Sequence, residues 1–185
     1  MTESITPRQF HEADGVEDWR VVGEGACTYF RTGSFAASAG LVDAIGELAG
    51  LEDHHPDVDL RYGGVTVRLI TITHDHYGLS ERDVELARQI SAVARELGVS
   101  ADPSAVQTVQ FTIDALVGPK VMPFWRAVLD YRERSDSPDE DLVDPRSRGP
   151  SFWFQQMDAP RPQRNRIHID VWVPHDQAED RKSVV

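Results

Sequence analysis

The stretch "DHHPDVDLRYGGVTVRLITITHDHYGLSERDVELA", residues 53–87, decides the fold of the first half of the chain. Apolar and polar residues alternate on both sides of Gly63 and Gly64, a pattern that predicts a β-hairpin over residues 57–72. We expect the two glycines to form the turn, because glycine readily takes a positive φ. The hairpin should bring its two histidine-containing ends to the same level.

Short strands and helices are expected on either side of the hairpin. Residues 18–32 predict two strands around a glycine turn, and apolar residues at helical spacing predict helices that begin near Ser34 and Ser80 and end at Gly50 and Gly98. The residues expected on their buried faces are Ala37, Leu41, Ile45 and Leu48, and Val84, Ala87, Ile90, Ala94 and Leu97. No parallel βαβ spacing occurs in this part, so the fold class is expected to be α+β, with an antiparallel sheet packed against helices.

A short Pro-containing segment, residues 99–105, predicts a linker between two domains, residues 1–100 and 106–185. The second domain is expected to have the order β-α-β-β, with a polar loop after the helix. Its elements are expected at residues 106–115 (strand), 121–131 (helix), 132–150 (polar loop), 151–157 (strand) and 166–174 (strand). The apolar side of the helix is expected to consist of Phe124, Trp125, Val128 and Leu129.

The sequence stops where a further helix is expected to begin, which predicts that the second domain is truncated. Residues 176–185 should then be poorly packed. Apolar side chains that the missing part would cover should remain exposed, and the candidates are Phe152, Phe154, Ile169 and Trp172.

Composition narrows the classes of function. The 185 residues carry a formal charge of −12, so the surface repels nucleic acid. No stretch approaches the ~20 apolar residues that a membrane helix needs, and the first residues lack the positive region and apolar core of a secretory signal. The single cysteine, Cys27, excludes an internal disulfide and a cysteine-based zinc site. We therefore expect a cytoplasmic protein without nucleic-acid or membrane partners.

A metal site is one interpretation of the histidines at the two ends of the hairpin. Its candidate ligands are His54, His55, His74 and His76, with Asp53 or Asp75 as a carboxylate. Neighbours on an extended segment point to opposite faces, so His54 and His55 cannot easily bind one ion. The stretch also lacks the i, i+4 histidine pair of a zinc protease. The spacing therefore weighs against a metal.

Two further interpretations concern the helix start and proton transfer. Ser80 and Asp83 have the spacing of a capping box, in which Asp83 reaches back to the helix N-terminus, and a histidine in a loop is usually a surface residue. Three imidazoles on segments joined by one hairpin instead indicate a pocket for proton transfer near neutral pH. We expect Ser80 and Asp83 to cap the helix and His74 to take part in chemistry.

The His-His-Pro at residues 54–56, the strand pair, and the Thr-His and Gly-Leu-Ser-x-x-Asp that follow resemble the pterin-4a-carbinolamine dehydratase family over residues 5–98. Tyr77 departs from the small residue that this family usually has before the glycine, and its bulk could narrow the pocket mouth or stack on the pterin. The resemblance implies catalytic imidazoles at His54, His55 and His74, a supporting carboxylate at Asp83, and a pterin site lined by Pro56, Thr73, Asp75 and His76.

The reaction that this resemblance implies is loss of water from a 4a-hydroxytetrahydropterin, giving the quinonoid dihydropterin, as in tetrahydropterin recycling. One group must protonate the departing C4a hydroxyl and another must accept a ring N–H proton, which neutral and protonated imidazoles can do without a metal or organic cofactor. We expect each histidine-to-alanine change to slow the reaction by roughly 10²–10⁴-fold, and Asp83→Ala to cost mainly the cap, about 1 kcal/mol. A homodimer or tetramer is also expected.

The second half resembles the glyoxalase-like, vicinal-oxygen-chelate family in "FTIDALVGPKVMPFWRAVLDY" and "RNRIHIDVWVP". This family's unit is βαβββ and two units normally form one site. Residues 106–157 would form one unit, and the strand at 166–174 would open an incomplete second unit. Gln110 and His168 are the only metal-ligand candidates, and both also fit an ordinary strand.

Two alternatives to a pterin dehydratase remain open. The first domain's fold also serves as a non-catalytic dimerisation or assembly module. The glyoxalase-like part could instead be the active one, with an unknown small metabolite as substrate. The presence of all three matched histidines favours the dehydratase.

Overall fold

The computed structural model describes residues 3–160, 162 and 166–182, and it divides into two compact units. Each unit has its own hydrophobic core. In the part of the chain that the structure describes, no helix is long and apolar enough to cross a membrane. The first unit comprises Met1–Ile72, His76–Gln107 and Val173–Val185, and the second comprises Thr73–Asp75 and Thr108–Trp172.

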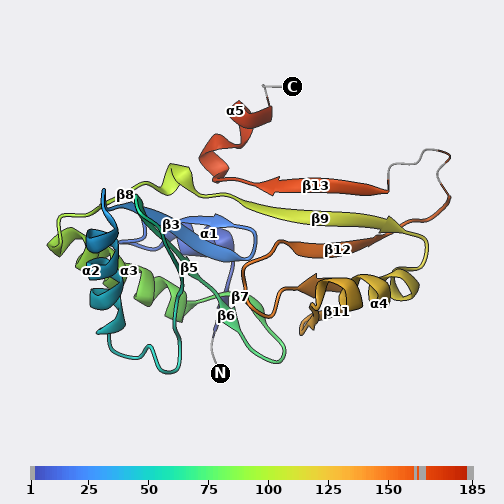
Figure 1. The fold of residues 1–185 in the computed structure, drawn as a ribbon, viewed down its shortest axis with the longest axis horizontal. Helices are drawn as coiled ribbons and strands as arrows, with labels where there is room; N and C mark the ends of the chain where they lie inside the picture. The colour runs from blue at the N-terminus through green and yellow to red at the C-terminus, as the bar shows by residue number, and fades with distance from the viewer. Residues whose placement is uncertain (1–2, 161, 163–165, 183–185) are drawn as a thin grey trace. The chain divides into compact units, whose positions relative to one another are not determined.

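The first unit is built on an antiparallel sheet (Figure 1). Ala26 and Phe30 of one central strand and Val65, Val67 and Leu69 of the other are buried, because alternate residues of a strand point to the same face. In spatial order the strands are β2 (Arg20–Val22), β3 (Gly25–Arg31), β5 (Gly64–Leu69) and β4 (Asp57–Leu60), and β8 (Ser100–Ala101) also pairs with β3. The last pairing shows that part of the expected linker belongs to the sheet.

Two helices, α2 (Phe35–Gly46) and α3 (Glu81–Glu96), pack on this sheet and bury Leu41, Ile45 and Ile90, among others. The Oγ of Ser34 accepts a hydrogen bond from the Ala37 amide at 3.2 Å, as an N-cap should. The antiparallel sheet covered by helices confirms the expected α+β fold.

Two of the expected buried helix positions are wrong. Ala37 is exposed, and Ser38 takes the inward position because its hydroxyl donates to the carbonyl of Arg61 at 3.0 Å. Leu97 is half exposed because it is the C-cap residue of α3, where the chain leaves the helix through Gly98 at φ +68°.

The hairpin of β4 and β5 is present, but its glycines act differently from the expectation. The positive φ values in the structure do not include Gly63 or Gly64. A Cβ on Gly64 would lie 2.3 Å from the carbonyl oxygen of Phe30 on the neighbouring strand. The glycine is therefore needed for the close approach of two strands rather than for the turn conformation.

A small second sheet continues the hairpin into the third helix. Its strands are β1 (Ser4–Ile5), β7 (Tyr77–Ser80) and β6 (Thr71–Ile72), all antiparallel, and α1 (Pro7–Glu12) follows β1. The β6–β7 pairing sets Thr71 and Ser80 close enough for their hydroxyl oxygens to lie 2.6 Å apart. This sheet therefore positions polar side chains at the N-terminus of α3.

The second unit has the order βαβββ followed by one more strand (Figure 1). Its elements are β9 (Thr108–Ala115), α4 (Gly118–Leu129), β10 (Arg132–Arg134), β11 (Ser137–Val143), β12 (Ser151–Gln156) and β13 (Ile167–Trp172). The spatial order is β10-β11-β12-β9-β13, with β12 and β9 parallel and the other neighbours antiparallel. The expected polar loop is wrong: it contains β10 and β11, whose outer residues are charged while Leu142 and Val143 are buried.

The expected exposure of the second unit's apolar residues is only partly right. Ile169 and Trp172 are exposed, but Phe152 and Phe154 are buried against α4. On α4 the inner side chains are Met122, Trp125 and Leu129, whereas Phe124 and Val128 are 63% and 62% exposed. Trp125 and Leu129 therefore face the sheet as expected, together with Met122, whereas the expectation is wrong for Phe124 and Val128.

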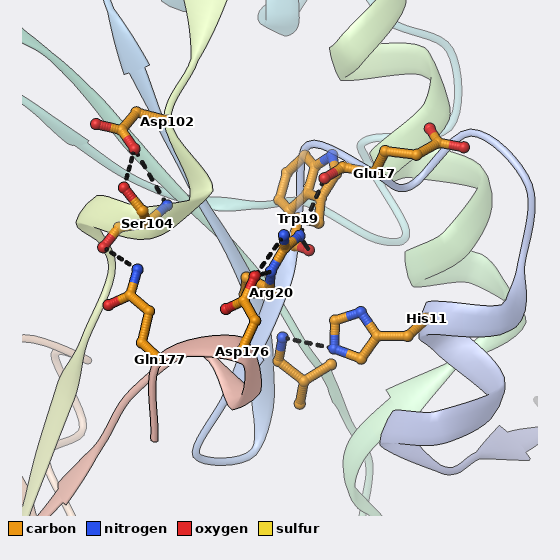
Figure 2. Close-up of polar contacts among 9 residues, drawn as sticks. His11, Glu17, Trp19, Arg20, Asp102, Ser104, Asp176 and Gln177 are labelled. Carbon is orange, nitrogen blue, oxygen red and sulfur yellow. Dashed lines mark hydrogen bonds and ion pairs between the residues drawn. The ribbon is translucent and has the colours of Figure 1, made fainter. Parts of the chain in front are cut away.

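The segment after β13 groups with the first unit. It forms a 3₁₀ turn, η2 (His175–Gln177), and a short helix, α5 (Ala178–Lys182). Asp176 forms an ion pair with Arg20 at 2.9 Å (Figure 2). Of the expected poorly packed tail, residues 176–185, Asp176 and Gln177 make polar contacts with the first unit, but Asp176, Glu179 and Asp180 are exposed, while residues 183–185 lie outside the described residues.

Candidate active site

Asp83 lies in the first turn of α3 and its side chain is fully buried. Its Oδ2 accepts hydrogen bonds from the Ser80 amide at 2.8 Å, the Thr71 hydroxyl at 2.7 Å and the Ser80 hydroxyl at 3.0 Å. The contact with the amide is the part of the capping box in which the acidic residue reaches back to the helix start. One carboxylate oxygen is thus fully occupied by the helix N-terminus and the small sheet.

The other carboxylate oxygen binds His54. The Nε2 of His54 lies 2.9 Å from Oδ1 of Asp83, and the imidazole side chain is 10% exposed. An ionised carboxylate only accepts hydrogen bonds, so Nε2 carries the proton and Nδ1 is the basic nitrogen of the neutral ring. The pair is therefore a fixed imidazole with one nitrogen available for proton transfer.

Burial and hydrogen bonding act in opposite directions on Asp83. Burial alone raises the pKa of this carboxyl group, but hydrogen bonds from His54, Thr71 and the Ser80 amide outweigh it. The pKa of Asp83 is consequently held below its usual range. The carboxylate is ionised near neutral pH and favours a proton on the side of His54 that faces it.

Burial alternates along the residues that lead from His54 into β4. His55 is exposed and Pro56 is half-buried at the start of β4. His54 is thus the inward member of the histidine pair and His55 the outward one.

The loop between β6 and β7 carries the other predicted site residues. Thr73, His74 and Asp75 are exposed, and the Thr73 hydroxyl donates to Oδ1 of Asp75 at 2.9 Å. These three residues group with the second unit, so the convergence of His74 with the histidine pair stays a prediction. His76 is half-buried and its Nε2 donates to the carbonyl of Leu79 at 3.2 Å.

Arg68 is a further residue of this region that the sequence analysis missed. It lies directly opposite Asp57 in the hairpin, and its Nη1 donates to Oδ2 of Asp57 at 3.3 Å. The guanidinium also hydrogen-bonds the Tyr77 side chain, so Tyr77 already has a partner in the protein. The hairpin register places an acidic and a basic residue opposite each other, and this pattern could have identified the pair.

Thr71 was also missed. It is buried at the end of the hairpin, and its hydroxyl contacts both Ser80 and Asp83. A threonine in an alternating strand gives no signal of this role, because its partners lie in the following strand and helix.

The described residues offer little for a metal. No group of three or more His, Cys, Asp or Glu side chains among them is arranged to hold an ion. In the second unit, Gln110 lies opposite Asp170 and His168 lies opposite Thr112, so the two candidate ligands are not cross-strand partners. His168 is exposed, with its Nε2 3.6 Å from Oδ2 of Asp170.

The α+β fold and the buried carboxylate–imidazole pair define a scaffold with a candidate histidine acid/base site. Residues 3–93 match the pterin 4 alpha carbinolamine dehydratase family, and residues 110–185 match a glyoxalase-like domain. The first part of the chain belongs to the pterin-4a-carbinolamine dehydratase family and is followed by a glyoxalase-like domain, as the sequence resemblance indicated.

Individual relatives match the first half of the chain over nearly their whole length. A putative pterin-4-alpha-carbinolamine dehydratase of Nocardia farcinica is 39% identical over 95 residues, which are 51% of this chain and 98% of that protein. A protein of the same description from Acidobacterium capsulatum is 36% identical over 90 residues, 48% of this chain and 96% of that protein. A crystal structure of a transcriptional coactivator/pterin dehydratase from Brucella melitensis is 30% identical, with a TM-score of 0.41, and covers 50% of this chain and 99% of that chain.

Proposed function

We propose that the first unit dehydrates 4a-hydroxytetrahydropterin to the quinonoid dihydropterin, as a 4a-hydroxytetrahydrobiopterin dehydratase acting in tetrahydropterin recycling. The observation that carries this proposal is the 2.9 Å contact between His54 and the buried Asp83 in a chain of this family. Such a pair fixes the orientation of an imidazole and leaves its second nitrogen for a substrate proton.

The three histidines divide the proton transfers between them in this proposal. His54 accepts the ring N–H proton at Nδ1, while Asp83 stabilises the imidazolium that forms, as the carboxylate of a catalytic triad does. His55 or His74, both on exposed segments, protonates the departing C4a hydroxyl, which leaves as water. The C4a–O bond breaks as water leaves and the ring N–H proton passes to His54, so imidazole acid/base catalysis can carry the proposed step without a metal or organic cofactor.

The remaining residues of the site bind the pterin in this proposal. Pro56, Thr73, Asp75 and His76 line the ring, and Tyr77, held by Arg68, limits the width of the pocket. The active form is a homodimer or tetramer.

The test is the rate of dehydration of the 4a-carbinolamine by the full chain. Single changes of His54, His55 and His74 to alanine are each expected to lower the rate by roughly 10²–10⁴-fold. His168→Ala, an exposed histidine on β13 without a role in this reaction, is the matched control. Circular dichroism of each variant separates loss of chemistry from loss of fold. Parental rates in all three site variants would show that this unit is not a histidine-dependent dehydratase.

A further inference from the structure

The first unit binds the C-terminal segment through a small set of polar contacts (Figure 2). Nε and Nη2 of Arg20 donate to Oδ2 of Asp176 at 3.1 and 2.9 Å. The Nε2 of Gln177 donates to the carbonyl of Ser104 at 3.1 Å, and Pro174 is buried beside them. The η2 turn therefore has a defined docking surface made by β2 and the residues before β9.

Arg20 is held in place by the first unit itself. Its Nη1 donates to the carbonyl oxygens of Glu17 at 3.0 Å and Trp19 at 2.8 Å (Figure 2). The guanidinium is thus oriented before Asp176 arrives, which lowers the entropic cost of forming the ion pair.

His11, on α1, completes this surface. Its Nε2 accepts a hydrogen bond from the Val21 amide at 3.3 Å, so this nitrogen carries no proton when the contact is made (Figure 2). Its ring also packs on the ring of His175, with centroids 4.7 Å apart. Protonation of both nitrogens of His11 would therefore break the hydrogen bond that Nε2 accepts from the Val21 amide.

The charges around His11 also disfavour its protonation. The titratable and charged groups that face it are His175 and Asp176 of η2 and Arg20 of β2. Burial, His175 and Arg20 lower the pKa of His11 below 6.5, and only Asp176 opposes them. Asp176 is already paired with Arg20, so it compensates a charge on His11 incompletely.

We propose that docking of residues 174–178 on the first unit requires an uncharged His11, so that this C-terminal segment is released as the pH falls. This inference goes beyond dehydration and involves none of the residues proposed for that reaction. Protonation breaks the hydrogen bond from the Val21 amide and sets an imidazolium against the ring of His175, where the charge of Arg20 also disfavours it. The docked segment is thus a ligand of the first unit whose affinity depends on one proton.

The direction of the pH effect follows from linkage. His11 binds a proton less readily in the docked state than in the released state, so docking is strongest above the ordinary histidine pKa of about 6.5. Below this pH the docking constant falls by up to about tenfold per pH unit, until the pKa of the docked state is passed.

The experiment is a pH titration of the ¹⁵N-labelled full chain by NMR between pH 7.5 and 5.0. The amide signals of Asp176, Gln177 and Ala178 should shift with the same midpoint as the His11 ring, below pH 6.5. Their heteronuclear NOE values should fall towards those of a mobile segment, while the amides of α3 remain unchanged. A segment that stays rigid to pH 5.0, or that moves with a midpoint different from that of His11, would overturn the proposal.

Two variants isolate the role of His11. In His11→Gln the side-chain amide oxygen can still accept from Val21 and never gains a charge, so the segment should stay docked at pH 5.0. His168→Gln is the control and should keep the parental titration, because this exposed histidine lies on β13. Release of the segment in His11→Gln at the parental pH would show that another group controls docking.

Discussion

Asp83 is bound by more groups than a helix cap requires. The capping motif alone led to an expected loss of about 1 kcal/mol for Asp83→Ala. In the structure the change would also leave His54 and Thr71 without their buried partner. We therefore expect a loss of about 2–4 kcal/mol in the free energy of unfolding, because unsatisfied buried polar groups cost about 1–3 kcal/mol each. Urea unfolding, monitored through hydrogen exchange of the α3 amides, measures this loss. A loss near 1 kcal/mol would mean that Asp83 stabilises the protein only as a helix cap.

The lowered pKa of Asp83 makes a second prediction, about acid stability. A carboxyl group whose pKa is depressed by folding contributes stability that is complete above its unfolded pKa of about 3.9 and is lost as the pH falls through its folded pKa. The parent should therefore lose more unfolding free energy between pH 6 and pH 3 than Asp83→Asn, whose side chain does not titrate. Equal losses in the two proteins would show that Asp83 is not held ionised.

How much of the site was predictable depended on where each residue's partners lie in the chain. Ser80 and Asp83 are three residues apart, so the capping contact could be read from local spacing. His54, the other partner of Asp83, lies 29 residues earlier in the chain, and only the family resemblance indicated that both residues belong to the site. Thr71 could not be found, since its role depends on three-dimensional pairing of β6 with β7.

The β4–β5 hairpin offers a test of what its two glycines do. A Cβ at Gly64 would lie 2.3 Å from the Phe30 carbonyl oxygen, whereas a Cβ at Gly63 would approach only the Tyr29 hydroxyl, at an ordinary 3.6 Å. Gly64→Ala should therefore cost roughly 2 kcal/mol or more, as severe steric strain does, and Gly63→Ala should stay within about 1 kcal/mol of the parent. Thermal unfolding of the two variants compares them. Equal losses would restore the interpretation that both glycines serve the turn.

Two glycines, Gly98 after the end of α3 and Gly40 within α2, offer a pair of alanine substitutions with opposite expected effects on stability. Gly98 has φ +68° and Gly40 lies within α2, and an added Cβ would meet no atom within 4 Å at either position. Gly98→Ala should lose about 1 kcal/mol from backbone strain, whereas Gly40→Ala should gain about 0.5–1 kcal/mol from helix propensity. The denaturation midpoints of both variants measure these changes in stability. Stabilisation by Gly98→Ala would contradict the positive φ at the C-terminal end of α3.

The hairpin and the helices α2 and α3 were predictable because their signals are local, although α2 ends at Gly46 rather than at the expected Gly50 and α1 was missed. Ser34 and Gly98 mark helix ends in the sequence as they do in the structure. The strands β10 and β11 were missed because charged residues occupy their exposed positions and resemble a loop. The parallel pairing of β12 with β9 was likewise invisible, since pairing between distant strands leaves no periodic pattern in either one.

In the part of the chain that the structure describes, each unit has its own buried apolar core. The core of the first unit includes Trp19 and Ile90, and that of the second includes Phe152 and Phe154. The two sets share no residue, so loss of packing in one set does not remove a contact from the other.

This separation predicts two unfolding transitions in calorimetry, each sensitive to its own core. Phe154→Ala should lower the stability of the second unit by about 3–5 kcal/mol, and Ile90→Ala should lower that of the first by about 2–5 kcal/mol, because each leaves a cavity in a close-packed interior. Each variant should move one transition and leave the other in place, since changes at sites that share no partner add independently. Amide NMR signals of α3, followed over the same temperatures, identify the transition of the first unit. A single transition lowered by both changes would mean that the two cores unfold as one cooperative body.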